Sequence, residues 1–304
     1  MAVADTLRTL SFTAKITILS SEPYPPIDRT KLSKALITDP SQILLRTEAI
    51  LKDLDITLQH AKVTKVDTSS KSVTTDSGDT VQYDKLVLAT GGSPRLLPLK
   101  GFDKLKGIYK LRTVDHTKEI VDAVKGGNKK VVIIGTGFIG MEIAIALHKD
   151  NDITLIGMEK VPLYFSLLDN ANGSERVLGE KVGLVLQHMH ESKGIKFKLD
   201  ASVESAEASS ILSYNVGAIK LKSGESIPAD VVILAVGIGP ATEFLKESGF
   251  TLERDGSLSV DKFMRVKGVQ DVYATGILLQ ASSQILIQQV ILHDSHILNK
   301  ITNH

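Results

Sequence analysis

The sequence Lys130-Val-Val-Ile-Ile-Gly-Thr-Gly-Phe-Ile-Gly-Met-Glu142 contains the pattern that predicts the fold of this chain. A wholly apolar run ends at Ile134, and a turn with three glycines follows it and leads into a stretch of helical composition that reaches Leu147. This order of strand, glycine turn and helix is typical of a βαβ unit that binds a dinucleotide. We therefore predict a parallel α/β domain around these residues.

The three glycines of the turn have separate expected roles. Gly135 permits the tight turn, Gly137 lets the backbone approach a pyrophosphate, and Gly140 lets the helix pack closely on the strand. Phosphates are expected at the N-terminus of the helix, because its free N–H groups and its dipole favour anions. A glycine turn that binds nothing is the alternative interpretation, but the complete order of elements favours a nucleotide site.

A second strand of the predicted unit, Ile153-Thr-Leu-Ile156, ends close to Glu159. Glu159 follows the glycines by roughly 20 residues, the position at which an acid accepts hydrogen bonds from the ribose hydroxyls. This position predicts a preference for NADH. Lys160 is adjacent and could bind a 2′-phosphate, so NADPH stays open as an alternative.

Outside this unit, a similar strand ending occurs twice. Ala89-Thr-Gly91 and Ala235-Val-Gly237 each close an apolar run, as expected where a buried parallel strand ends beside a ligand. We predict an internally duplicated α/β fold with two Rossmann-like, three-layer domains. The first half is predicted to open with a helix at 2–10 and a strand at 15–20. A β-meander is then predicted from four short strands at 56–58, 61–66, 72–75 and 81–83.

The composition limits the classes of function. The chain of 304 residues carries a formal net charge of +1, with acids and bases mixed along its length, which is not the pattern of a nucleic-acid-binding protein. It contains no cysteine, so a dithiol relay within the chain is excluded. We predict no integral membrane segment, no metal site and a cytoplasmic location, with His188 and His190 exposed to solvent. The oligomeric state is left open.

Four motifs of this chain resemble those of the pyridine nucleotide-disulfide oxidoreductases that use FAD and NAD(P)H. The resemblance is to the branch that contains apoptosis-inducing factor and the ferredoxin reductases, and it covers most of residues 2–276. The motifs are Tyr24-Pro-Pro-Ile-Asp-Arg-Thr-Lys-Leu-Ser-Lys34, Leu88-Ala-Thr-Gly-Gly-Ser-Pro-Arg95, Gly135-Thr-Gly-Phe-Ile-Gly-Met-Glu142 and Asp271-Val-Tyr-Ala-Thr-Gly276. They occur in the order that the family has.

The resemblance implies roles for individual residues. In such proteins the residues that match Arg29, Lys34 and Arg95, and the backbone near Val63, contact FAD. The acid that matches Glu142 lies close to the nicotinamide and would be the catalytic residue. Arginine and lysine side chains at these positions can pair with phosphates. The remaining predicted cofactor-binding positions are the strand ends Ala89, Thr90, Gly91 and Gly237.

The function that the resemblance implies is an FAD-dependent NAD(P)H oxidoreductase. Electrons would pass from NADH through the flavin to an external acceptor, which would be a protein of the ferredoxin or Rieske type or a quinone-like molecule. Two alternatives stay open. One is a non-catalytic NAD-binding remnant that cannot hold FAD, and the other is a chain that does not fold stably because an edge of its first sheet is exposed.

The chain is expected to depart from the family in three places. The first strand and glycine loop of the FAD domain are missing before Met1, residues 164–174 are an insertion, and Ile277 stands where the family has an aspartate that binds the flavin ribityl chain. The chain is therefore expected to be truncated at both ends. The predicted domains are an incomplete FAD-binding domain at 1–111, an NAD(P)-binding domain at 112–238, a return to the FAD domain at 239–276 and an unrelated tail at 277–304.

Overall fold

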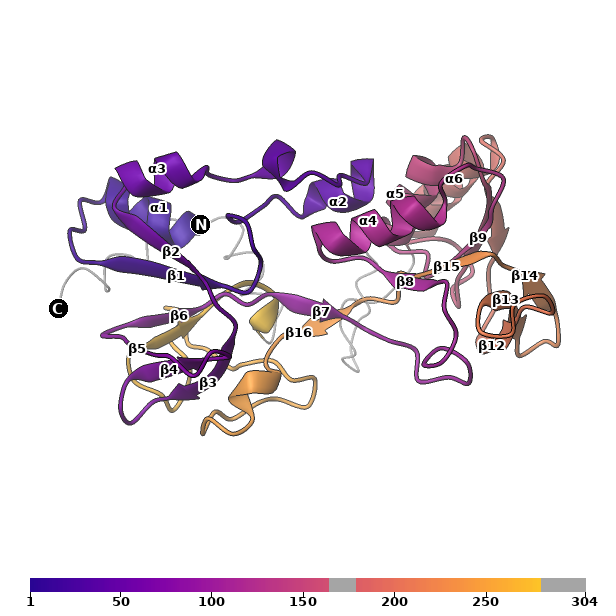
Figure 1. Ribbon diagram of the computed structural model, residues 1–304. Helices are drawn as coiled ribbons and strands as arrows, with labels where there is room; N and C mark the ends of the chain where they lie inside the picture. Colours follow the sequence, from indigo (N-terminus) through magenta and orange to yellow (C-terminus); the bar gives the residue numbers. More distant parts are fainter. Residues whose placement is uncertain (164–178, 280–304) are drawn as a thin grey trace. The chain divides into compact units, whose positions relative to one another are not determined.

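The computed structural model describes residues 1–163 and 179–279 (Figure 1). The predicted insertion at 164–174 and residues 280–304 of the predicted tail lie outside the described residues. The chain folds into two compact units. Unit 1 contains residues 1–27, 44–93 and the described residues from Gly239 onwards, whereas unit 2 contains residues 28–43 and 94–238.

Unit 2 is built on a five-stranded, all-parallel sheet with the strand order β11-β10-β9-β15-β8. Its strands are β8 (Ile108–Lys110), β9 (Lys130–Ile134), β10 (Asp152–Ile156), β11 (Lys196–Lys198) and β15 (Val231–Leu234). From β9 the chain proceeds outward through β10 and β11 on one side, and it then returns to β15 on the other side. The strand order therefore reverses between β9 and β15. Open parallel sheets bind ligands at the carboxyl ends of the strands at such a reversal.

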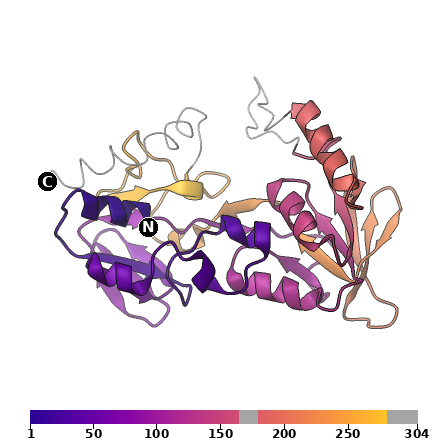
Figure 2. The same cartoon turned by 90° about the horizontal axis from the view of Figure 1, so that it is seen from above.

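Different layers cover the two faces of this sheet (Figures 1 and 2). Because side chains alternate between the faces of a strand, Val132 and Ile134 face one layer, where they pack in a cluster with Ile219. That layer is an antiparallel sheet of β12 (Val203–Ala208), β13 (Val216–Leu221) and β14 (Ser226–Pro228). The other face carries α4 (Val114–Ala123), α5 (Phe138–Leu147) and α6 (Gly179–Glu191). Burial on both faces explains why the β9 stretch is continuously apolar.

Residues 28–43 belong to unit 2, although the sequence places them far from its sheet. α2 (Thr30–Ala35) packs on α5 and is followed by the 3₁₀ turn η1 (Pro40–Ile43). The predicted domain boundaries assigned residues 28–43 and 94–111 to the first domain. The structure differs there, because α2 packs on α5 and β8 pairs in parallel with β15. Which cofactor each unit binds stays a prediction.

Unit 1 combines small parallel and antiparallel sheets with short helices. β1 (Ile16–Ser20) and β2 (Ile56–His60) are parallel, as are β6 (Leu86–Leu88) and β17 (Val272–Ala274). β3 (Val63–Asp67), β4 (Ser72–Thr75) and β5 (Thr80–Gln82) form an antiparallel meander. The helices are α1 (Ala2–Thr9), whose Leu7 packs against Tyr273, and α3 (Glu48–Asp53), whose Leu51 packs against Ile56.

The predicted helix at 2–10 and strand at 15–20 are confirmed by α1 and β1. The predicted meander of four strands is wrong in its first strand, because β2 pairs with β1 in parallel register, Ile16 opposite Ile56. The helix α3 lies between these two strands in the sequence, and parallel strands need such a crossover connection. The meander therefore begins at β3.

The remaining elements lie where the chain passes between the units or close to its described end. They are β7 (Gly92–Pro94), β16 (Ile238–Pro240), η2 (Glu243–Leu245) and η3 (Gly276–Leu278). Leu245 and Leu278 are fully buried, and they belong to the same hydrophobic core as Val66 of β3. The predicted α/β class is confirmed. Within residues 1–163 and 179–279, no helix is both long and apolar enough to cross a membrane.

Candidate functional site

The glycine turn connects the end of β9 to the start of α5, at the point where the strand order of unit 2 reverses. Gly135 has φ +113°, a conformation that side chains rarely adopt. A Cβ atom on Gly135 would collide with the carbonyl oxygen of Ala235, and a Cβ on Gly140 would collide with the carbonyl oxygen of Gly135. These two glycines therefore permit the turn, β15 and α5 to pack against one another.

Gly137 differs from the other two glycines in its backbone. It is the N-cap residue of α5, with φ −76° and ψ −178°, an extended conformation that any residue can adopt. No side chain caps this end of the helix. The first N–H groups of α5 therefore have no partner within the helix, and together with the helix dipole they favour an anion at this point.

Thr136, between the first two glycines, links the turn to the end of β10. Its side chain is buried, at 7% exposed, and a Cβ on Gly157 would lie 2.5 Å from the Thr136 Oγ1 atom. The Thr136 carbonyl accepts a 3.0 Å hydrogen bond from the Leu163 N–H. Gly157 was not among the predicted site residues. Its position directly after the β10 apolar run was the only signal in the sequence.

Glu159 follows the end of β10 and is half-buried. Burial raises the pKa of its carboxyl above the usual range. The Glu159 carbonyl accepts a 3.0 Å hydrogen bond from the Asp200 N–H, which ties the backbone in place. Among the residues that the structure describes, no cation pairs with the Glu159 carboxylate, so its oxygens are free to accept hydrogen bonds from a ligand.

The second turn of α5 carries Glu142, which contacts α2. The Glu142 Oε1 atom lies 3.0 Å from the Lys34 Nζ atom, and the Oε2 atom accepts a 2.5 Å hydrogen bond from the Ser33 hydroxyl. Ser33 is buried, whereas the Lys34 side chain is 56% exposed and that of Glu142 is 26% exposed. Sequence reasoning selected Lys34 and Glu142 separately and missed Ser33.

The other predicted site residues of unit 2 lie just outside its helices and strands. The Arg29 Nη1 atom, at the start of α2, donates a 2.9 Å hydrogen bond to the Arg112 carbonyl. Arg95 is exposed, and its backbone N–H donates a 3.0 Å hydrogen bond to the Gly237 carbonyl. Gly237 has φ +92°, and a Cβ on it would meet nothing within 4 Å. The structure thus brings Arg95 next to the end of β15.

The predicted residues of unit 1 lie on β3 and after β6. Val63 of β3 is paired with Thr75 of β4. Ala89 and Thr90 are exposed directly after β6, and the Thr90 hydroxyl donates a 2.9 Å hydrogen bond to the Ala241 carbonyl. Gly91 has φ +69°, and its carbonyl accepts a 3.0 Å hydrogen bond from the Ala241 N–H. A shared role in cofactor binding stays a prediction for these residues.

One of the two histidines of α6 departs from the prediction. His188 is not buried, as expected, but His190 is only 8% exposed. Its Nε2 atom lies 3.2 Å from the Met141 carbonyl of α5, and its ring packs edge-on against Phe197. The prediction that His190 is solvent-exposed was wrong, because packing of α6 on α5 and β11 covers it.

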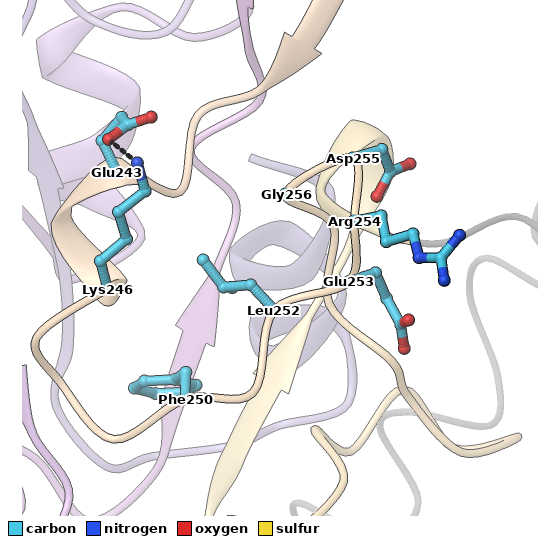
Figure 3. Close-up of a pocket in the computed structure, with 8 residues that line it drawn as sticks. All are labelled: Glu243, Lys246, Phe250, Leu252, Glu253, Arg254, Asp255 and Gly256. Carbon is cyan, nitrogen blue, oxygen red and sulfur yellow. Dashed lines mark ion pairs between the residues drawn. The ribbon is translucent and has the colours of Figure 1, made fainter.

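A surface hollow of about 460 Å³ in unit 1 is unrelated to the predicted site (Figure 3). Two of its carboxylates have partners within the protein: Glu243 pairs with Lys246 at 2.6 Å, and Glu253 accepts a hydrogen bond from Ser259. Arg254 points away from the buried Phe250 (Figure 3). The hollow therefore lacks a convergent set of polar groups, and the geometry favours the glycine turn of unit 2 as the site.

The sequence of this chain is similar to a known protein family and to named members of it. The family model described as pyridine nucleotide-disulphide oxidoreductase matches residues 1–285. Apoptosis-inducing factor 3 of Homo sapiens is 33% identical over 278 residues, which cover 91% of this chain and 43% of that protein. The chain thus spans less than half the length of this relative.

Two solved structures have a similar fold. The ferredoxin reductase of Rhodopseudomonas palustris has a TM-score of 0.80 at 25% identity, covering 90% of this chain and 64% of that one. The covalent complex of putidaredoxin reductase with putidaredoxin contains a chain with a TM-score of 0.80 at 26% identity, covering 93% of this chain and 66% of that one.

Proposed function

This chain belongs to the pyridine nucleotide-disulphide oxidoreductase family, and we infer its function from that membership. Proteins of this family use FAD and NAD(P)H. We propose that this chain binds reduced NAD(P)H on unit 2 and passes its electrons through FAD to a separate electron carrier.

The observation that carries this proposal is the glycine turn at the strand reversal of unit 2. Gly135 and Gly140 allow the turn to approach the strand ends so closely that no side chain fits there. The N-terminus of α5, which no side chain caps, presents N–H groups without partners in the helix, and this is the arrangement that binds a pyrophosphate. Glu142 lies in the second turn of α5, and we propose that its carboxylate meets the nicotinamide end of the same ligand.

Glu159 supports NADH as the preferred donor. Its carboxylate has no cation partner in the described part of the chain, and hydrogen bonds from ribose hydroxyls would satisfy it. A 2′-phosphate at that position would repel the ionised carboxylate. Lys160 is exposed beside it, and NADPH remains the second candidate donor for this reason.

The residues proposed to hold FAD are Arg29, Lys34, Val63, Arg95 and the Ala89–Gly91 strand end. Exposure of Ala89 and Thr90 after β6 is consistent with a cofactor-lining backbone, and the cationic groups can pair with phosphates. Bound flavin would supply the redox chemistry, accepting two electrons as hydride and releasing them one at a time. The protein's own part is to bind and orient both cofactors.

The proposed acceptor is a small electron-carrier protein. A reductase for ferredoxin and a reductase in complex with putidaredoxin share the fold of this chain, and those names support a carrier of that kind. The chain contains no cysteine, so electrons leaving the flavin cannot pass to a dithiol within it. A quinone-like small molecule is the alternative acceptor.

A second function, NAD(P)H binding without flavin, is favoured by Ile277. This side chain is 40% exposed in η3, and unlike the aspartate expected there by resemblance it offers no hydrogen-bond acceptor to a ribityl chain. The two functions differ in whether the purified protein binds FAD.

The test is to purify the full chain, record its flavin absorbance, and add NADH without oxygen. The proposed function predicts a yellow protein, or one that takes up added FAD, whose absorbance is bleached by NADH. Reduction of ferredoxin in a coupled assay would then identify the class of acceptor. A colourless protein that binds NADH but takes up no FAD would contradict the flavin role and favour the second function.

A further inference from the structure

We propose that Ser33 is a positioning residue: its hydroxyl fixes the Glu142 carboxylate so that this group accepts a hydrogen bond from the carboxamide N–H of the nicotinamide. The inference rests on the proposed function, because it needs a nicotinamide nucleotide at the glycine turn. It assigns to α2, far from the turn in the sequence, a role in recognising one particular amide.

The Glu142 carboxylate is held by two donors that arrive from consecutive residues of α2. Ser33 donates to Oε2 at 2.5 Å, and Lys34 approaches Oε1 at 3.0 Å. Each oxygen therefore has its own donor, and the plane of the carboxylate is defined by the pair. Hydrogen bonds to a charged carboxylate are about twice as strong as neutral ones.

Ser33 restrains the carboxylate more firmly than Lys34 does. Ser33 is 5% exposed and has a short side chain, so little motion is left to its hydroxyl. The Lys34 side chain is 56% exposed and long, so its ammonium group can move in solvent. A second acceptor near the Ser33 hydroxyl is the Thr30 carbonyl at 3.5 Å, which is too distant for a strong bond. The single hydroxyl proton is therefore directed to Glu142.

The backbone under Ser33 is also fixed. Leu32, the preceding residue, is 2% exposed, and α2 packs on α5. The helix ends at Leu36 in a left-handed conformation with φ +47°, which stops it after Ala35. Anchoring on both sides of Ser33 means that the hydroxyl is placed by the fold and does not have to be ordered by the ligand.

The carboxylate keeps capacity for a ligand. Ionised glutamate can accept about four hydrogen bonds, and Ser33 and Lys34 supply two donors. The side chain of Glu142 is 26% exposed, so a ligand can reach it. The nicotinamide carboxamide offers two N–H donors. A carboxylate fixed by Ser33 can accept one of them and hold the ring in a single orientation.

The test compares NADH with reduced 3-acetylpyridine adenine dinucleotide, in which a methyl group replaces the carboxamide NH₂. Affinities of the full chain are measured by titration for the wild type and for Ser33→Ala. We expect Ser33→Ala to weaken NADH binding by about tenfold to a hundredfold, the range for a hydrogen bond that involves a charged group. The acetylpyridine analogue should bind both proteins equally, because it has no N–H to offer.

Thr30→Ala is the matched control. It removes a hydroxyl from the same helix, but one that bonds to Asp28 at 2.7 Å and not to Glu142. The affinity of this variant for both nucleotides should be that of the wild type. Melting temperatures of the wild type and of the three variants report whether α2 remains folded. Ser33→Thr, which keeps a hydroxyl, should retain much of the wild-type NADH affinity.

The outcomes separate this inference from the proposed function. Equal weakening of both nucleotides in Ser33→Ala, or no weakening of either, would overturn the positioning role while leaving the nucleotide site intact. A wild-type chain that binds neither nucleotide would overturn the proposed function and this inference with it.

Discussion

Gly135 and Gly91 both have positive φ and both follow a parallel strand, but the two glycines lead into different elements. After β9 of unit 2, Gly135 at φ +113° leads directly into α5, whose first N–H groups have no capping side chain. After β6 of unit 1, Gly91 at φ +69° leads into more extended chain, and its carbonyl and the Thr90 hydroxyl both bond to Ala241.

This difference is the reason that the anion site is proposed at β9 and not at β6. At β9 the polar backbone groups remain available to a ligand, whereas at β6 the described polar groups are engaged by the protein. The two endings are distinguished by the helix after the turn, because only a helix N-terminus aligns several free N–H groups and a dipole. Substitutions at each ending test whether the two endings differ in this way.

The largest effect is expected at the crowded β9 ending. Gly135→Ala should destabilise unit 2 by about 3 kcal/mol or more, because it combines backbone strain with a collision against the Ala235 carbonyl. Gly237→Ala is the matched control, since Gly237 also has positive φ but open space around its Cβ position. It should cost only about 1–2 kcal/mol of strain. Urea unfolding of both variants measures the difference, and equal losses would mean that crowding does not distinguish Gly135.

The next effect concerns the acid at the edge of the proposed site. Glu159→Gln should weaken NADH binding by about tenfold, because a neutral amide is a poorer acceptor for ribose hydroxyls than a carboxylate. NADPH binding should be unchanged or improved, since repulsion of the 2′-phosphate is removed. Titration of both proteins with both nucleotides gives the ratio of NADH affinity to NADPH affinity. If Glu159→Gln has the same ratio as the wild type, the adenosine ribose does not bind at Glu159.

The same carboxyl predicts a pH dependence. Burial raises the Glu159 pKa, so the proton is lost at a higher pH in the folded protein than in the unfolded chain. Stability due to this group is therefore present below its unfolded pKa and is lost as pH rises through the raised folded pKa. NADH affinity should change in the opposite sense, increasing as the carboxyl ionises across that same window. Glu159→Gln should abolish both trends, and their persistence would assign them to another group.

The smallest effect is expected at the β6 ending. Thr90→Val removes the hydroxyl that bonds to Ala241 and should lower the free energy of unfolding by about 1 kcal/mol. NADH affinity should not change, because the NADH site is proposed on unit 2. Unfolding and titration of the same preparation give both values. A loss of NADH affinity here would contradict the division of roles between the two endings.

Local patterns in the sequence were sufficient for the β9–α5 unit. The apolar run and the spacing of Gly135, Gly137 and Gly140 are short-range features, and the structure confirms the strand, turn and helix that they predict. Long-range packing could not be predicted in this way. Ser33 reaches Glu142 across 109 residues of sequence, and a buried serine in a short helix has no periodic signature. His190 was mispredicted for the same reason, since its burial depends on α5 and Phe197.

The pairing of β2 with β1 shows another limit. The alternating residues of the first half predicted strands correctly, but alternation does not reveal which strand is the neighbour. The crossover connection between β1 and β2 contains only short helical elements, and the last of them, α3, has six residues, Glu48–Asp53, too few for a clear hydrophobic period.

NADH binding to the variant Gly137→Leu tests whether the pyrophosphate of the nucleotide lies at the start of α5. The torsions of Gly137 suit any residue, so the fold should survive, while the leucine side chain would occupy the proposed pyrophosphate position. Titration should show NADH affinity at least about a hundredfold weaker, a loss of ~2.7 kcal/mol, with an unchanged melting temperature. Unchanged affinity in a folded variant would contradict the placement of the nucleotide at the start of α5.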